Sequence, residues 1–507
     1  MRSPAHFPAC LGIIAAFLGP IPAAVMGFSH IGSGPASLSE SLPAPQFHGW
    51  SFELLSNSYY PVPSGFCGTL SDQVLANVLW AMAQVPQFGE YRELFVALPD
   101  NLYRYDQLTH TILRHKRGDL RYNSGSAFEI GVAVPSHEEC GMVVQAGLLA
   151  ATAFWTREKG NVVSCPLRWA VSHANTSWDP DHPLRMVVLF GNAEASGLDT
   201  LLVARSSDQS LPDPHTSGAD TFERVVANLV QDSLFEPIEL SWETISQLLW
   251  AGYGVTPHLT FRSRQALTVP GALGNYRLTG RLFLVHRQGV DRYHSRLPGD
   301  NELKSRDHRL ERIVTGDRRA ELSQASARIP DNAAAYFVVC VSDTGDWEAL
   351  QEAGAVAFQL MAQARALGLS GFLTMPLTRS ERRMIAASLD LPDGNLPVLV
   401  FACGAPADQE TSAEPGDVQI VTGPPAVRTG ILRVEYLLRR AGTVRAEVFD
   451  LLGRPVRLLF EEHQAAGYHS AYWNGTDGDG RPVKRGSYIL VVSSSGSVAQ
   501  HKVTWAR

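Results

Sequence analysis

The chain has 507 residues, of which 45% are hydrophobic and 18% are charged, and its formal net charge at pH 7 is −7. This length predicts two or three domains, and the composition is that of a folded globular protein, which excludes a largely disordered chain. The negative charge, and a sequence without a stripe of Lys and Arg interleaved with aromatic residues, argue against a general nucleic-acid-binding protein.

The N-terminal segment has the pattern of an export signal. Arg2 precedes an apolar run over residues 10–28, and small residues cluster near residues 23–27, as at a signal-peptidase cleavage site. A glycine and two prolines interrupt the run, which favours a cleaved signal over a permanent membrane anchor. We therefore expect residues 1–27 to be a signal peptide and the mature protein to be exported.

The cysteines do not indicate a disulfide framework. Of the six cysteines, Cys10 lies in the signal segment, and the odd number that remains is widely spaced and contains no CxxC pair. Cys165, Cys340 and Cys403 lie in apolar, strand-like runs, where we expect them to be buried as small hydrophobic residues.

The first half of the mature chain has an α+β order of elements. Ser71 is the expected N-cap of a helix that ends near Ala83, and its apolar residues recur at helical spacing. Ser136-x-x-Glu139 has the pattern of a capping box, which would begin a second helix that ends near Trp155. Strands are expected at residues 95–98, 102–105, 127–134, 162–167 and 184–190.

The second half repeats this order. The matching blocks are residues 75–86 and 245–257, 111–121 and 308–319, 139–151 and 352–364, 162–167 and 372–377, and 184–191 and 396–404. So many blocks in one order indicate an internal duplication. We expect the two halves to pack on each other as an intramolecular pseudo-dimer with a pseudo-two-fold axis.

Residues 241–274 are the most informative stretch. A helical apolar run that includes Trp250 leads into a turn marked by glycine and proline, Arg262 and Arg264 follow, and a Pro-Gly-Ala-Leu-Gly segment then enters a strand. Such parts can form a wall for a planar, phosphorylated cofactor, because guanidinium groups bind phosphate and glycines let backbone N–H groups approach closely.

The same stretch resembles the flavin-binding part of nitroreductase-family oxidoreductases of the azoline-dehydrogenase (SagB-like) branch. Those proteins carry a run like LSQLLWAAYG, followed by R-T-x-P-S-A-G-x-x-Y-P, and this chain has SQLLWAGYG followed by its own arginines and PGALGNY. The resemblance implies FMN as the cofactor and hydride transfer through the flavin. It also implies flavin sites at the interface between two subunits, which a fused pair of halves would supply from one chain.

The resemblance also assigns cofactor-binding residues, although it leaves the catalytic residues unknown. Arg264, and Arg262 beside it, match the family arginine before P-S-A-G and would clamp the phosphate; a solvated pair of loop arginines is the alternative. At Gly371 and Phe372 the family presents backbone to the flavin ring; an ordinary strand start is the alternative. The other candidates match P-S-A-G-x-x-Y, the family's E-A-G helix and this strand start. They are Pro270, Gly271, Ala272, Tyr276, Glu352, Gln359, Gly371 and Phe372.

The chain departs from the family pattern at several points. Gly271 replaces the serine whose hydroxyl would contact flavin, and Arg277 replaces a proline. The basic R-R-S-x-R cluster is absent ahead of both LLWA-like helices. A second hypothesis follows, in which the protein is a secreted, non-catalytic binding or structural protein on a degenerate flavoenzyme fold.

No metal site is expected. The consecutive residues 137–140 (His-Glu-Glu-Cys) would point to different faces of a helix. Residues 476–480 (Thr-Asp-Gly-Asp-Gly) have an acidic spacing reminiscent of a calcium loop, but the family resemblance of the C-terminal part, given next, implies a hairpin turn there.

The C-terminal part has a different composition. Strand-like runs alternate with glycine-containing turns from residue 430, and Val444, Ala446 and Val448 alternate with polar neighbours as in a β-sandwich. The run VEYLL…GTVRAEVFDLLGRPVRLL…GYHSAYWNGTDGDGRPVKRGSY resembles FlgD-like immunoglobulin-type domains. Such domains end many secreted bacterial proteins and overlap with sorting modules, which implies a bacterial protein in the periplasm, at the cell surface or outside the cell.

We therefore predict two nitroreductase-like α+β halves packed as a pseudo-dimer and a C-terminal Ig-like β-sandwich. The expected partners are an unidentified small molecule and, through the C-terminal domain, the cell surface or the secretion machinery, but no nucleic acid. The expected segments are a signal peptide (1–27), a linker (28–63), the first half (64–192), a linker (193–219), the second half (220–405), a linker (406–425) and the β-sandwich (426–507).

Overall fold

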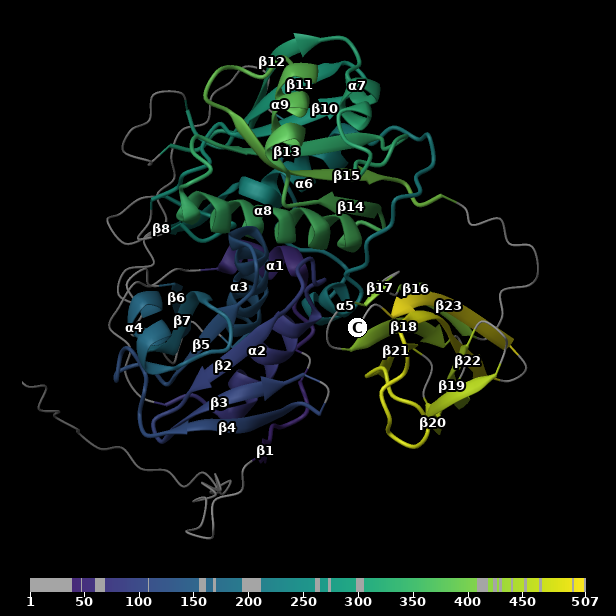
Figure 1. Cartoon of the computed structure of the whole chain (residues 1–507). Helices are drawn as coiled ribbons and strands as arrows, with labels where there is room; N and C mark the ends of the chain where they lie inside the picture. The colour runs from purple at the N-terminus through teal and green to yellow at the C-terminus, as the bar shows by residue number, and fades with distance from the viewer. Residues whose placement is uncertain are drawn as a thin grey trace, which may run out of the picture. The chain divides into compact units, whose positions relative to one another are not determined.

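The structure is a computed structural model, and it shows an α+β protein with a separate β-sandwich at its C-terminal end (Figure 1). It describes residues 39–505 except 47, 60–68, 108, 155–160, 167–169, 194–210, 260–264, 272–274, 298–304, 408–417, 423–425, 428–430, 439–440, 451–453, 465–466 and 495–496. The predicted signal peptide lies outside the described residues. No helix among the described residues is long and apolar enough to span a membrane.

The first half consists of an antiparallel sheet with helices on both faces. Its helices are α1 (Phe52–Ser58), α2 (Asp72–Gln84), α3 (His137–Thr152) and α4 (Ala170–Ser177). Its strands are β1 (Ser39–Ser41), β2 (Glu93–Ala97), β3 (Asn101–Asp106), β4 (Thr111–Arg117), β5 (Phe128–Ala133), β6 (Asn161–Pro166) and β7 (Leu184–Ala193).

The period-two pattern of the central strands explains why both faces of this sheet are covered. In β2, Leu94 and Val96 join the core cluster that contains α2 and α3, whereas Phe95 and Ala97 pack with Trp178 on the other face, beside α4. Every residue of β2 and β5 is buried as a result.

The second half is built in the same way. Its helices are α5 (Phe222–Ala227), α6 (Trp242–Tyr253), α7 (Arg319–Gln324), α8 (Trp347–Ala366) and α9 (Arg379–Ser388). Its strands are β8 (Val255–Leu259), β9 (Gln265–Leu267), β10 (Leu282–His286), β11 (Gly289–His294), β12 (Arg309–Thr315), β13 (Ala335–Val341), β14 (Ser370–Thr374) and β15 (Leu396–Gly404). Cys340 and Cys403 are fully buried, as predicted; the surroundings of the Cys165 side chain are not described.

The two sheets have the same strand order. The first runs β1-β4-β3-β2-β5-β7-β6 and the second β12-β11-β10-β13-β15-β14, so each strand from β2 to β7 has a counterpart at the same place, and β1 is an addition at one edge. The helices correspond in chain order as well, with α2 matching α6 and α3 matching α8. This is the arrangement that the repeated sequence blocks predicted.

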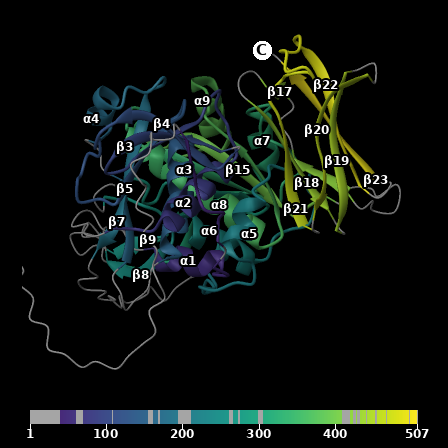
Figure 2. The same ribbon diagram turned by 90° about the horizontal axis from the view of Figure 1, so that it is seen from below.

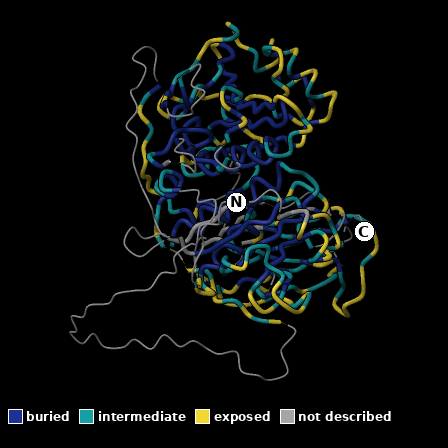
Figure 3. The backbone as a smooth tube through the Cα atoms, turned by 90° about the vertical axis from the view of Figure 1, so that its left-hand side faces the viewer, coloured by how far each residue is buried: buried dark blue, intermediate teal, exposed yellow. Residues whose placement is uncertain are grey.

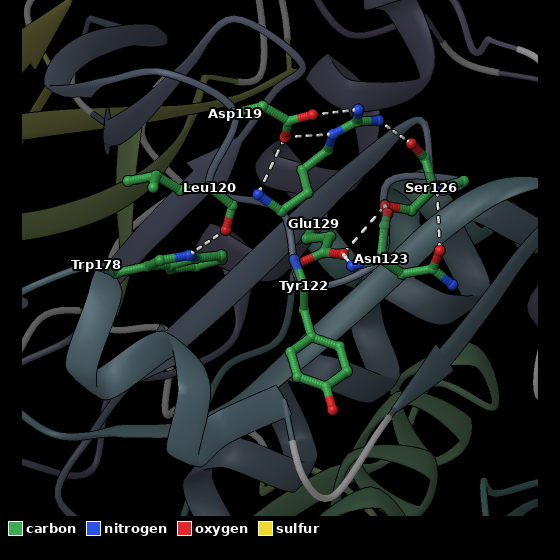
Figure 4. A network of polar contacts seen from close by, with 9 residues as sticks. Asp119, Leu120, Tyr122, Asn123, Ser126, Glu129 and Trp178 are labelled. Atoms are coloured by element: carbon green, nitrogen blue, oxygen red, sulfur yellow. Dashed lines mark hydrogen bonds and ion pairs between the residues drawn. The ribbon is translucent and has the colours of Figure 1, made fainter.

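A turn of sequence Gly-Asp-x-Arg recurs at the end of the matching strands β4 and β12. Arg121 bonds Asp119 through Nε (2.9 Å) and Nη2 (2.7 Å), and Arg319 bonds Asp317 through the same atoms (3.0 and 2.7 Å). In both turns the guanidinium also donates to a backbone carbonyl just ahead of the next sheet strand, at Ser126 in the first half (Figure 4). The two halves therefore share local geometry in addition to topology.

The halves meet where α3 crosses α8, and each helix places a glycine against the backbone of the other (Figure 2). A Cβ on Gly141 would lie 1.9 Å from the carbonyl oxygen of Gln351, and a Cβ on Gly354 would lie 1.8 Å from that of Glu138. The contacts are reciprocal, because Gly141 and Glu138 of α3 correspond to Gly354 and Gln351 of α8. Reciprocal contacts of this kind are the property of a two-fold interface.

A second reciprocal contact joins α1 and α5. Ser51 and Thr221 cap these two helices and form an antiparallel bridge with each other. Phe52 N donates to the Asp220 carbonyl (3.3 Å), and in the symmetry-related bond Phe222 N donates to the Trp50 carbonyl (2.8 Å). The stretch that we expected to be a linker, residues 28–63, therefore contains β1 and α1, which pack on the fold.

One apolar core extends through both halves. It includes residues of α1, α2, α3 and β5 together with residues of α6, α8 and β13, and Figure 3 shows this buried material continuing from one half into the other. Unfolding of one half would expose the apolar surface that the other half buries against it, and would therefore destabilise the other half.

The C-terminal domain is a two-sheet β-sandwich. Its strands are β16 (Val418–Thr422), β17 (Ala426–Val427), β18 (Leu432–Leu438), β19 (Gly442–Asp450), β20 (Pro455–Gln464), β21 (Gly467–Trp473), β22 (Gly486–Ser494) and β23 (Ser497–Trp505). The sheets run β16-β18-β21 and β17-β23-β22-β19-β20, and Trp473 and Trp505 pack between them. Asp477 accepts from the N–H groups of Asp479 (3.0 Å) and Arg481 (2.9 Å), so residues 476–480 form the predicted turn.

Replacement of either helix-crossing glycine by alanine tests this packing. Gly141→Ala and Gly354→Ala should each lower the free energy of unfolding by about 3 kcal/mol, because the methyl group would overlap a backbone carbonyl that cannot move freely. Helix propensity alone would favour alanine by about 1 kcal/mol, so the predicted sign is opposite to the local effect. Gly345→Ala, whose Cβ would meet only the side chain of Asp343, is the control in denaturant unfolding; equal effects at all three positions would contradict the packing account.

Candidate functional site

The predicted cofactor residues lie on and around the segment between α6 and β10. Arg262, Arg264 and Ala272 lie outside the described residues, so their placement stays a prediction. Pro270 and Gly271 are partly exposed. A Cβ on Gly271 would lie 2.9 Å from the Asn275 carbonyl oxygen and from the Tyr276 ring. This close approach explains why glycine stands where the resembling family has serine.

Tyr276 and Glu352 are both buried, and each accepts from backbone N–H groups of the α6–β10 segment. The Tyr276 hydroxyl accepts from Leu267 N (3.0 Å), which fixes the ring beneath the loop. The Glu352 carboxylate accepts from the hydroxyl of Tyr253 and from the N–H groups of Arg277 (2.9 Å) and Leu278 (3.2 Å). Glu352 therefore ties α8 to the residues that lead into β10. Burial raises its pKa to about 7, and the hydrogen bonds oppose that rise.

Glu139, the counterpart of Glu352, holds the equivalent loop of the first half. Its carboxylate forms an ion pair with Arg92 (2.7 Å) and accepts from Gly89 N (2.8 Å). Ser136 does cap α3 by accepting from Glu139 N (3.0 Å), but the Glu139 side chain is committed to Arg92 and Gly89. The predicted capping box is therefore half formed, because the buried guanidinium of Arg92 is a stronger partner than a helix-terminal N–H.

Two glutamine side chains from opposite halves converge on one backbone carbonyl. Gln359 of α8 and Gln145 of α3 both donate through Nε2 to the carbonyl oxygen of Thr268, at 2.7 and 3.1 Å. The Oε1 atom of Gln359 accepts from Ser56 Oγ (3.1 Å). Thr268, just after β9, is therefore a meeting point of both halves.

Gly371 and Phe372 lie in β14 and contribute differently from the other candidates. A Cβ on Gly371 would lie 2.5 Å from the Phe401 ring, and its carbonyl accepts from Asp232 N (2.9 Å). The Phe372 side chain packs on the face of the sheet that carries α9, opposite to the face that α8 covers. The structure therefore does not bring the Phe372 side chain to the seam with Glu352 and Gln359.

Polar atoms that the sequence did not single out surround the β8–β9 hairpin. Each is buried and has no hydrogen-bond partner within the part of the chain that the structure describes. They are Gln145 Oε1, Thr256 Oγ1, Gln265 Oε1 and Ser295 Oγ. Gln265 donates to the carbonyl of Thr256 within the hairpin, and Gln145 of α3 donates to the carbonyl of Thr268 just after it. Ser295 follows β11 and precedes Arg296, which donates to the carbonyl of Gln265.

Arg296 adds a positive charge to this group. Its side chain is buried, donates to the carbonyl of Gln265 and lies over the Tyr276 ring at 5.3 Å. The sequence gave no local signal for Arg296, because nothing in a single arginine at the end of a strand predicts burial. Gln145 fell within a matched block, and the repeat alone could not show that its side chain crosses the seam.

Comparison with known proteins identifies the last domain. Residues 426–497 match the family described as FlgD Ig-like domain. The C-terminal domain is a FlgD Ig-like domain, as predicted. Among curated proteins, none matches the sequence.

The structure is also similar to solved nitroreductase structures. A protein of Anabaena variabilis assigned as a nitroreductase matches at a TM-score of 0.47 and 12% identity, over 68% of this chain and 93% of that chain. An FMN-dependent nitroreductase of Clostridium difficile matches at a TM-score of 0.25 and 13% identity, over 37% of this chain and 88% of that chain. A chain of the microcin synthetase McbBCD complex of E. coli matches at a TM-score of 0.26 and 19% identity, over 36% of this chain and 72% of that chain.

The buried carboxylate of Glu352 generates a pH prediction. Its folded pKa lies above the ordinary value of 4.5, so the native state retains a proton that the unfolded chain has released, and stability is lost as the pH rises from about 4.5 to about 7. The unfolding free energy of the protein minus that of Glu352→Gln should fall by about 3 kcal/mol over this range. Urea titrations at several pH values measure the difference, and a pH-independent difference would contradict the assignment.

Proposed function

We propose that the protein binds FMN at the seam between its halves and acts as an exported, FMN-dependent oxidoreductase. The observation that carries the proposal is the set of partnerless buried polar atoms around the β8–β9 hairpin, contributed by both halves. Buried polar atoms in folded proteins almost always have partners, so a group of orphaned ones marks the place of a ligand or of ordered water.

The chemistry of this group fits a flavin. An isoalloxazine ring presents both N–H donors and carbonyl acceptors along its polar edge. The amide oxygens of Gln145 and Gln265 would accept from ring N–H groups, and the hydroxyls of Thr256 and Ser295 would donate to ring carbonyls. Arg264 and Arg262 would bind the phosphate as the family resemblance implies, and Arg296 adds a buried positive charge nearby.

Bound FMN would supply hydride transfer, which amino-acid side chains cannot perform. The residues of this chain would bind the ring, fix its orientation and exclude water from it. The hydrogen bonds of Tyr276 and Glu352 would hold the loop that borders the site, because the Glu352 carboxylate connects that loop to the central helix α8.

Export is part of the proposal. It is supported by the predicted signal peptide at residues 1–27 and by the FlgD Ig-like domain at residues 426–497. A bacterial surface or extracellular location, with the C-terminal domain as the attachment or sorting module, is consistent with both features.

A second candidate function is a non-catalytic binding or structural role on the same fold. It is favoured by the saturation of the predicted site residues, since the hydroxyl of Tyr276, the carboxylate of Glu352 and both ends of the Gln359 amide have protein partners. A protein that takes up no flavin would support this alternative.

Flavin uptake tests the proposal. The purified protein should show the visible absorbance of bound flavin or acquire it when FMN is added. Arg264→Ala should weaken FMN binding about tenfold or more, because a charge-assisted contact to the phosphate is lost. Arg287→Ala is the matched control, since Arg287 is an exposed arginine of the same half that pairs with Glu239. Protein that stays colourless with excess FMN would overturn the proposal.

A further inference from the structure

We infer that each chain has one flavin site, built by α3 of the first half and by the described residues of the α6–β10 segment of the second, and that the symmetry-related site is closed. This inference rests on the proposed function. The reciprocal contacts of α3 with α8 and of α1 with α5 define a pseudo-two-fold relation between the halves. A site formed by α3 and the α6–β10 segment therefore has a mate formed by α8 and the α2–β2 segment.

The two segments differ greatly in length. Eight residues, 85–92, connect α2 to β2, whereas 28 residues, 254–281, connect α6 to β10. The longer segment contains the β8–β9 hairpin and the Pro-Gly-Ala-Leu-Gly run. The predicted phosphate contacts and two of the four orphaned polar atoms, Thr256 Oγ1 and Gln265 Oε1, therefore come from a stretch that the first half lacks.

Arg92 closes the short loop of the mate. Its Nη2 atom donates to the Pro86 carbonyl (2.8 Å) and to the Glu139 carboxylate (2.7 Å), and its Nη1 atom donates to the Val85 carbonyl. A Cβ on Gly89 would lie 2.4 Å from the side chain of Pro135. Both terminal nitrogens of the Arg92 guanidinium are therefore bound to protein oxygen atoms, whereas its buried Nε has no partner among the described residues, and the loop lies directly on its neighbour.

The helices are asymmetric at the corresponding positions. When Glu139 is aligned with Glu352 in the sequence, Gln145 corresponds to Phe358 and Ala146 corresponds to Gln359. Phe358 is fully buried in the shared core, so α8 presents an apolar ring where α3 presents an amide. Both glutamines donate to the second-half carbonyl of Thr268, so the polar groups of the seam gather at one site.

Titration of the full-length protein with FMN measures the number of sites. The expected result is one FMN per chain at saturation. Two FMN per chain would overturn the single-site inference and leave the proposed function standing. No FMN uptake even at a high FMN concentration would overturn the proposed function and the inference with it.

A pair of substitutions at matched positions locates the site. Gln145→Leu should weaken FMN binding about tenfold, because the side-chain amide that would bond the flavin ring is lost. Phe358→Leu should leave the FMN affinity and the stoichiometry unchanged. Thermal melts of both variants show whether the fold is retained. A loss of FMN affinity in Phe358→Leu equal to that in Gln145→Leu would overturn the assignment of the site to α3.

Discussion

The structure depends on one steric constraint, the absence of a side chain at the two positions where α3 and α8 cross. Gly141 and Gly354 let each helix backbone reach the carbonyl of the other, and any larger residue would force the helices apart. Because α3 and α8 also carry Glu139 and Glu352, this crossing fixes the positions of the loops that both carboxylates hold. The seam between the halves is therefore set by backbone contact.

Symmetry of the backbone coexists with asymmetry of the polar groups. The sheets share a strand order and the Gly-Asp-x-Arg turn. The loop after α2, however, is short and closed by Arg92, whereas the corresponding segment after α6 is long and polar. A fused pair of halves can diverge in this way, because a change in one half is no longer copied into its partner, as it would be in a homodimer. One half can then serve mainly as a wall for a site that the other half carries.

Much of the fold was predictable from the sequence. The repeated blocks predicted two halves of the same topology, and alternation with glycine turns predicted the β-sandwich, since both patterns depend on local periodicity. Residues 39–58 were expected in a linker because their composition suggests a loop, but α1 is stabilised by its contact with α5, which lies more than 160 residues along the chain. Tertiary contact outweighed local composition there.

The candidate site was predictable only in part. Motif matching placed Glu352, Gln359 and Tyr276 at the seam, but could not show that their polar groups already have protein partners. It placed Gly371 and Phe372 where the family presents backbone to the flavin, which stays a prediction. It could not show that the Phe372 side chain packs on the opposite face of the sheet while Leu373 enters the central core, because that depends on strand alternation in β14. Gln145 of α3, Thr256 of β8 and the adjacent residues Ser295 and Arg296 after β11 lie far apart in the sequence, so only the fold brings them together.

Native-state hydrogen exchange of the α3 and α8 amides, followed as a function of denaturant, tests the central claim most directly. If the two halves form one cooperative unit across the glycine crossing, the most protected amides of both helices should exchange with the same free energy and the same denaturant dependence. Exchange of one helix through an opening of clearly lower free energy, while the other stays protected, would show two independent halves and contradict the account.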